Sequence, residues 1–166
     1  MLRDTIQFTL GVQGTANTLT LYVSRLPREL DDPHSPTVSD LRLISYWLAT
    51  DNTRPIGLAR REFKRVTADE ANGSQATAST PDEAANLIAD EVKSLQFRYF
   101  DGVSWYDTWD GTATGFDGLT PLGPPLLIEI VLGMVVPSGD IHSGGQPSLK
   151  FYRHVVSIAT ADGVVQ

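Results

Sequence analysis

The chain of 166 residues contains no cysteine, and several other features are scarce. The absence of cysteine excludes thiol catalysis and thiolate metal sites, and it leaves the redox compartment open. No apolar run approaches the roughly 18 residues that predict a membrane-spanning helix. Basic residues are outnumbered, with 13 Lys and Arg against 20 Asp and Glu, which gives a net charge of -7. This charge disfavours nucleic acid and anionic membrane surfaces as partners, because both attract basic faces.

The motifs of common enzyme classes are also missing. The sequence has no Gly-x-Ser-x-Gly elbow, no glycine-rich phosphate loop and no His-Glu-x-x-His segment. His34, His142 and His154 lie in two predicted loops and one predicted strand. Asp107 and Asp110 could serve as a glycosidase-like pair, but nothing in the sequence indicates that one of them is desolvated. We therefore expect no enzymatic activity and no cofactor.

Two acidic segments supply oxygen ligands without the spacing of a known metal motif. The first lies in a proline-broken stretch, where we expect a solvated loop. The second does not fit an EF-hand, so we expect no metal there either, with calcium as the alternative. The residues concerned are Asp31, Asp32 and His34 in the first segment, and Asp107, Asp110 and Asp117 in the second.

The remaining sequence has the composition of one globular domain, residues 1–166, with 41% hydrophobic and 20% charged residues. Alternating apolar residues predict strands, and the nearly continuous apolar run 126–136 predicts a central strand covered on both faces. We expect a mainly β domain of two antiparallel sheets, or a partly open barrel, with one short helix. The expected strands outside the hairpin described below are 4–12, 18–24, 41–50, 56–67, 126–136 and 149–160, with turns at 13–17 and 51–55 and loops at 25–40, 68–79 and 137–147.

The expected helix begins at the segment Thr-Pro-Asp-Glu, residues 80–83. Thr80 can cap a helix, Pro81 suits its first position, and Glu83 completes a capping box. Apolar residues then recur at helical spacing. The pattern predicts a short helix over residues 81–90.

Residues 92–109 (VKSLQFRYFDGVSWYDTW) predict the hairpin around which the chain is organised. Asp101 and Gly102 mark its turn, because glycine adopts positive φ at little cost. A two-residue turn would put Trp105 beside Arg98, whereas a three-residue loop would pair Tyr99 with Val103. We predict the second register, because it gathers the apolar side chains on one face. These side chains are Leu95, Phe97, Tyr99, Val103, Trp105 and Trp109, with Trp105 beside Phe97.

Two surfaces offer alternatives for function. Trp105, Tyr106 and Trp109 are expected to form the core of the hairpin, and the alternative is a platform that binds sugar or peptide. A basic cluster is expected to be a solvated face, and the alternative is a patch that docks an acidic partner. This cluster consists of Arg54, Arg60, Arg61, Lys64 and Arg65.

Several segments together resemble the C-terminal half of the general secretion pathway protein J family, which are minor pseudopilins of the type II secretion system. The resemblance extends upstream through TLTLYVSRLP and RLISYWLA, so it covers most of the chain. The segments that carry it are Glu91 with Val92, residues 97–102 with Trp105 and Trp109, residues 125–132, and residues 153–156.

The resemblance implies an antiparallel β domain packed around a helical stem, with a role in assembly and no catalysis. The implied partners are other minor pseudopilins at the tip of a short fibre, and exported protein. The N-terminal apolar helix of such proteins is absent from this sequence, so we expect it upstream of Met1, as the sole contact with the membrane. The implied location is the periplasmic face of the inner membrane. The alternative function is a free-standing carbohydrate- or peptide-binding β module that uses Trp105, Tyr106 and Trp109.

Overall fold

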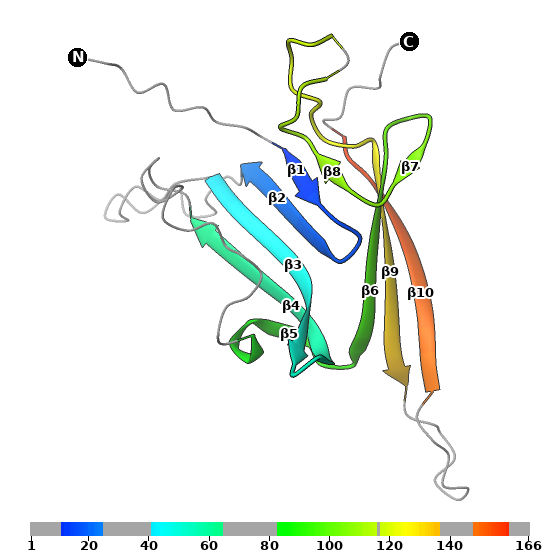
Figure 1. Cartoon of the computed structure of the whole chain (residues 1–166). Coiled ribbons are helices and arrows are strands. Elements are labelled where there is room, and N and C mark those ends of the chain that lie inside the picture. The colour runs from blue at the N-terminus through cyan, green and yellow to red at the C-terminus, as the bar shows by residue number, and fades with distance from the viewer. Residues whose placement is uncertain (1–10, 25–40, 65–82, 116, 137–147, 160–166) are drawn as a thin grey trace, which may run out of the picture.

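The computed structural model describes residues 11–24, 41–64, 83–115, 117–136 and 148–159. In these residues strands predominate and form two antiparallel sheets that do not close into a barrel (Figure 1). The predicted mainly β fold is therefore confirmed. The predicted loops 25–40, 68–79 and 137–147, which contain His34 and His142, lie outside the described residues.

The larger sheet has six strands in the order β5-β4-β3-β2-β1-β8. β2 has the predicted bounds, and β3 and β4 form the predicted long hairpin around Asn52 and Thr53, whose φ angles are positive. β1 begins where the predicted first strand ends and includes Gln13 and Gly14, so the predicted turn 13–17 is too long. The strands are β1 (Val12–Gly14), β2 (Thr18–Ser24), β3 (Leu41–Asp51), β4 (Arg54–Lys64), β5 (Leu87–Ala89) and β8 (Trp109–Asp110).

The smaller sheet has four strands in the order β10-β9-β6-β7. The predicted central position of β9 is confirmed, because β6 and β10 pair with its two edges. No described element packs over its second face (Figure 1), although every residue of β9 is buried or half-buried, including Glu129 on that face. The strands are β6 (Val92–Phe100), β7 (Trp105–Tyr106), β9 (Leu127–Val136) and β10 (Ser148–Ser157).

The main core lies between the two sheets. Alternation along β6 points Leu95, Phe97 and Tyr99 toward the larger sheet, where all three are buried. They pack with Val12, Leu19, Trp109 and Ile128, which come from β1, β2, β8 and β9.

The tip of the β1–β2 hairpin joins the two sheets directly. The backbone N–H of Phe97 donates to the carbonyl oxygen of Ala16 at 2.8 Å. The hydroxyl of Tyr99 donates to the carbonyl oxygens of Thr15 and Thr18, each 3.0 Å away. The hairpin tip therefore satisfies the backbone N–H of Phe97, on the part of the β6 edge that the two-residue strand β7 leaves uncovered, and the buried hydroxyl of Tyr99.

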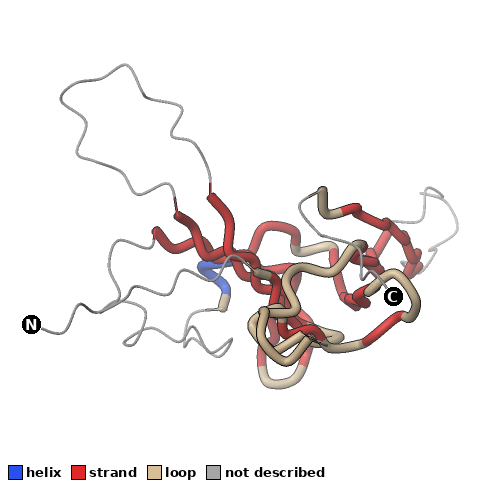
Figure 2. The backbone as a smooth tube through the Cα atoms, turned by 90° about the horizontal axis from the view of Figure 1, so that it is seen from above, coloured by secondary structure: helices blue, strands red, loops and turns tan. Residues whose placement is uncertain are grey.

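The predicted helix over residues 81–90 is wrong in its described part. A single 3-10 turn, η1 (Ala84–Asn86), is followed at once by strand β5; η1 is the short blue segment in Figure 2. β5 pairs with β4 and packs Leu87 against a small second core of Trp47 and Ala59. This tertiary pairing prevails over the local helical pattern.

The predicted register of the hairpin is also wrong, and so is the alternative register. Phe100 pairs with Trp105, which leaves residues 101–104 as the loop. The Asp101 carboxylate accepts hydrogen bonds from the backbone N–H groups of Val103 and Ser104, each at 2.7 Å. These bonds lengthen the loop, so Val103 is exposed and Trp105 lies on the face opposite Tyr99.

Candidate functional site

The three aromatic residues of the hairpin do not form one open platform. Trp109 belongs to the core, as predicted, and its indole N–H donates to the carbonyl oxygen of Gly123 at 2.9 Å. Trp105 lies on the other face of the smaller sheet, where its ring is 5.0 Å from that of Phe100. Tyr106 is exposed, with its ring 6.4 Å from that of Trp109. A sugar ring would therefore not meet these three rings on one surface.

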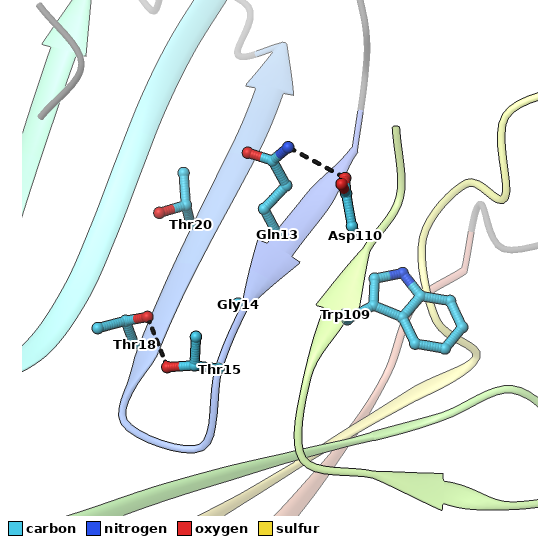
Figure 3. A pocket seen from close by; sticks show the side chains of 7 residues that line it. All are labelled: Gln13, Gly14, Thr15, Thr18, Thr20, Trp109 and Asp110. Carbon is cyan, nitrogen blue, oxygen red and sulfur yellow. Dashed lines mark hydrogen bonds between the residues drawn. The ribbon is translucent and has the colours of Figure 1, made fainter. Parts of the chain in front are cut away.

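A hollow of about 300 Å³, lined by several polar residues, lies along β1, β2 and β8. Gln13 donates to the carboxylate of Asp110 at 3.1 Å, and the hydroxyls of Thr15 and Thr18 are 2.9 Å apart. The Trp109 indole points away from these polar side chains (Figure 3). The hollow thus offers mutually bonded polar groups without an aromatic stacking surface. Its lining residues are Gln13, Gly14, Thr15, Thr18, Thr20, Trp109 and Asp110.

The acidic residues of the predicted calcium alternative have separate partners. Asp107 pairs with Arg98 at 3.5 Å. Hydrogen bonds from Thr112 hold the pKa of Asp110 below its usual value. Asp117 accepts hydrogen bonds from the N–H groups of Leu119 and Thr120 and from the Thr120 hydroxyl. In the described residues, no three acidic or histidine side chains form a group that could hold a metal ion.

The predicted basic cluster does not form one continuous exposed patch in its described part. Arg60 lies on the inner face of the larger sheet, where its Nε donates to the Tyr46 hydroxyl at 3.2 Å. Arg60 also pairs with Glu62, which raises the pKa of the guanidinium. Arg54 is exposed at the start of β4, beside the turn at the far end of the same hairpin. Arg65 lies outside the described residues.

The smaller sheet presents a surface that sequence reasoning did not identify, and we name it the outer sheet face. It is the side of the smaller sheet that points away from the larger one (Figure 1). The pairing registers place side chains from all four strands on it. Its defining residues are Arg98, Trp105, Glu129, Phe151, Arg153 and Val155.

A buried carboxylate lies at the centre of the outer sheet face. Glu129 is 5% exposed, and its side chain lies between two arginines from the neighbouring strands. Arg98 of β6 is 3.9 Å from Glu129 Oε1, and Arg153 of β10 pairs with Oε2. The Arg98 guanidinium also lies 5.6 Å from the centre of the Trp105 ring. The sequence contains one signal for this ion cluster, which is the single charge within the apolar run LLIEIVLGMVV. A charge that is buried in such a strand requires oppositely charged or hydrogen-bonding partners.

Large apolar side chains are exposed beside this ion cluster. Phe151 is 63% exposed, and Val155 is also exposed on the same face of β10. Tyr152, which points to the other side of the same strand, is exposed as well. Exposed apolar side chains that alternate with charged groups along one face are compatible with a surface that contacts another macromolecule.

No protein-family model matches the chain, and no curated protein matches it in sequence. No helix among the described residues is long and apolar enough to cross a lipid bilayer. The candidate site therefore rests on the geometry of the outer sheet face.

Proposed function

We propose that this chain is a structural subunit that acts through protein–protein contacts, as a minor pseudopilin of a type II secretion or type IV pilus-like fibre. The observation that carries the proposal is the outer sheet face, where Phe151 and Val155 are exposed around a partnered ion cluster. Such a surface combines an apolar contact area with polar groups that already have partners. Its role is recognition, and the proposal assigns no catalytic step to the chain.

The arrangement of the resembling segments supports the same proposal. Residues 97–102, 125–132 and 153–156 fall on β6, β9 and β10 or directly beside them, and these are adjacent strands of one sheet. Segments that are distant in the sequence thus contribute to one surface. A resemblance restricted to separate turns would have no such common location.

Within this proposal the partners are other minor pseudopilins at the tip of the fibre, and exported protein. The domain would act at the periplasmic face of the inner membrane, attached through a helix encoded upstream of Met1. The alternative of a carbohydrate-binding module has less support. Trp109 is buried, and Trp105 and Tyr106 point to opposite sides of β7.

Co-purification tests the proposal. The tagged protein, expressed from its own locus with any reading frame that continues upstream of Met1, should co-purify with proteins that carry apolar pseudopilin helices. Phe151→Glu places a charge on the outer sheet face and should reduce this recovery at least tenfold. Val103→Glu is the matched control, because Val103 is also 63% exposed but lies in the loop 101–104. Recovery of no pseudopilin, or equal recovery with both variants, would contradict the proposal.

A further inference from the structure

We propose that the outer edge of β10 binds an extended, acid-bearing segment of a partner protein, which adds to the smaller sheet as a fifth strand. This inference rests on the proposed function, because it names the kind of partner segment that the same surface would bind. The evidence for it comes from the backbone and the charge of β10.

β10 is the terminal strand of its sheet and is ten residues long. Of the described residues, those of β9 alone pair with it. The opposite side of the sheet differs, because β7 and the tip of the β1–β2 hairpin bond to β6 there. An uncovered strand edge of this length is a template for strand addition.

The hydrogen-bond pattern identifies the groups that point outward. Ile158 N–H donates to the carbonyl oxygen of Leu126 at 3.0 Å, so Ile158 points its backbone groups toward β9. In an antiparallel ladder this orientation alternates from residue to residue. The backbone N–H and C=O groups that point away from β9 therefore belong to Leu149, Phe151, Arg153, Val155 and Ser157.

Charge favours an acidic segment. β10 contains Lys150, Arg153 and His154 and no carboxylate, although the whole chain has a net charge of -7. The Arg153 side chain is 65% exposed, so its guanidinium has free surface beyond its pair with Glu129. A carboxylate opposite Arg153 would form a charge-assisted hydrogen bond.

The alternation of side chains also defines the apolar positions of the segment. Phe151 and Val155 flank Arg153 at two-residue spacing on the outer sheet face. The partner segment that fits is therefore apolar-x-acid-x-apolar. A second copy of β10 fits less well, because antiparallel pairing would bring its Lys and Arg side chains near those of the first copy.

The test is amide hydrogen exchange, followed by NMR on the whole chain, with the acetylated and amidated peptide TVTDTVT as probe. Before addition of peptide, the amides of Phe151, Arg153 and Val155 should exchange fast, and those of Tyr152 and His154 should be protected by β9. Saturating peptide should slow exchange at the first three at least tenfold. The peptide TVTKTVT, with lysine in place of aspartate, should bind at least tenfold more weakly.

A proline variant tests the edge itself. Val155→Pro removes an N–H that points outward, so the ladder with β9 is retained while strand addition is blocked. It should abolish peptide binding, and Val155→Thr, which keeps the N–H, should bind as the wild type does. Equal binding of the two peptides, unchanged exchange with peptide, or protection of the outward amides before peptide is added would each overturn the inference. Protection before peptide would mean that the chain itself or a second copy occupies the edge, and sedimentation distinguishes these occupants.

The outcomes separate this inference from the proposed function. If pseudopilins co-purify with Val155→Pro as well as with the wild type, the assembly role stands and strand addition is wrong. If the peptide binds as expected but no pseudopilin is recovered, strand addition stands and the assembly role is wrong.

Discussion

At the residue scale, the buried position of the Tyr99 ring requires the absence of a side chain at Gly14. Tyr99 is fully buried, and burial raises the pKa of its phenol, so the hydroxyl remains a hydrogen-bond donor well into the alkaline range. Gly14 lies directly against this ring. A Cβ at this position would be 2.7 Å from both the ring carbon that bears the hydroxyl and the carbonyl oxygen of Thr18.

We predict that Gly14→Ala destabilises the protein by about 1–3 kcal/mol, the usual cost of overpacking a core. The added methyl group would displace Tyr99 from the carbonyl groups of the hairpin tip. Chemical denaturation measures the change. Gly11→Ala is the control, because a Cβ there meets no atom within 4 Å, and its effect should stay below about 0.5 kcal/mol. Equal effects of the two substitutions would contradict this account.

A second prediction concerns Asp117 and the stability of the protein at acidic pH. Three hydrogen bonds to its carboxylate, the first from the Thr120 hydroxyl, lower its pKa from 3.8 to about 2. The unfolded chain therefore takes up this proton at a higher pH than the folded chain. The stabilisation from Asp117 is present above pH 4 and is lost as the pH falls from about 4 to about 2.

Carboxyl carbon NMR measures this titration directly, and the midpoint should lie near 2. Asp117→Asn should remove the corresponding part of the acid dependence of the melting temperature while the other carboxylates keep theirs. A midpoint near 4 in the wild type would show that the carboxylate is free in solution.

At the scale of elements, the ion cluster connects β6, β9 and β10. We predict that Glu129→Gln destabilises the protein by about 1–3 kcal/mol, between the values for exposed and buried ion pairs. The loss follows because two arginines would keep their charges beside a neutral amide. Thermal and chemical denaturation measure it.

Asp107→Asn is the matched control, since it makes the same chemical change beside the same Arg98 at an exposed position. We expect this control to cost less than about 0.5 kcal/mol. If both variants lower the free energy of unfolding by the same amount, the burial of Glu129 does not determine how much the ion cluster stabilises the protein.

Most strands could be predicted from sequence, because period-two alternation depends on the burial of one face. The bounds of β2 and the β3–β4 hairpin follow from this pattern directly. The stretch that begins at Glu83 could not be assigned correctly, because its strand exists through pairing with β4. The hairpin register depended on hydrogen bonds that the Asp101 carboxylate accepts from backbone N–H groups, and the apolar pattern does not contain this information.

The candidate site was less predictable than the fold. The aromatic residues were visible in the sequence, but which face each ring occupies depends on the register. The outer sheet face requires the order of β6, β9 and β10, which are separated by long stretches of sequence. Glu129 alone gave a local signal, and its two partners could be identified only after the strands were paired.

At the scale of the whole molecule, one core joins both sheets. Because β1, β2, β6, β8 and β9 all contribute to it, neither sheet can lose its packing separately. We predict one cooperative unfolding transition. The midpoints from far-ultraviolet circular dichroism and from tryptophan fluorescence should coincide, because both report the same two-state change. Separate midpoints would mean that the sheets unfold independently.

The contact between the hairpin tip and β6 has a consequence for aggregation. As long as Ala16 accepts the hydrogen bond from Phe97, this side of the smaller sheet is closed to other chains. Lifting the tip would expose Leu95, Phe97 and Tyr99 together with unpaired backbone groups, the combination that nucleates fibrils. The short β1–β2 hairpin thus covers an edge that would otherwise promote aggregation. Variants that loosen this hairpin should precipitate at temperatures below their own unfolding midpoint.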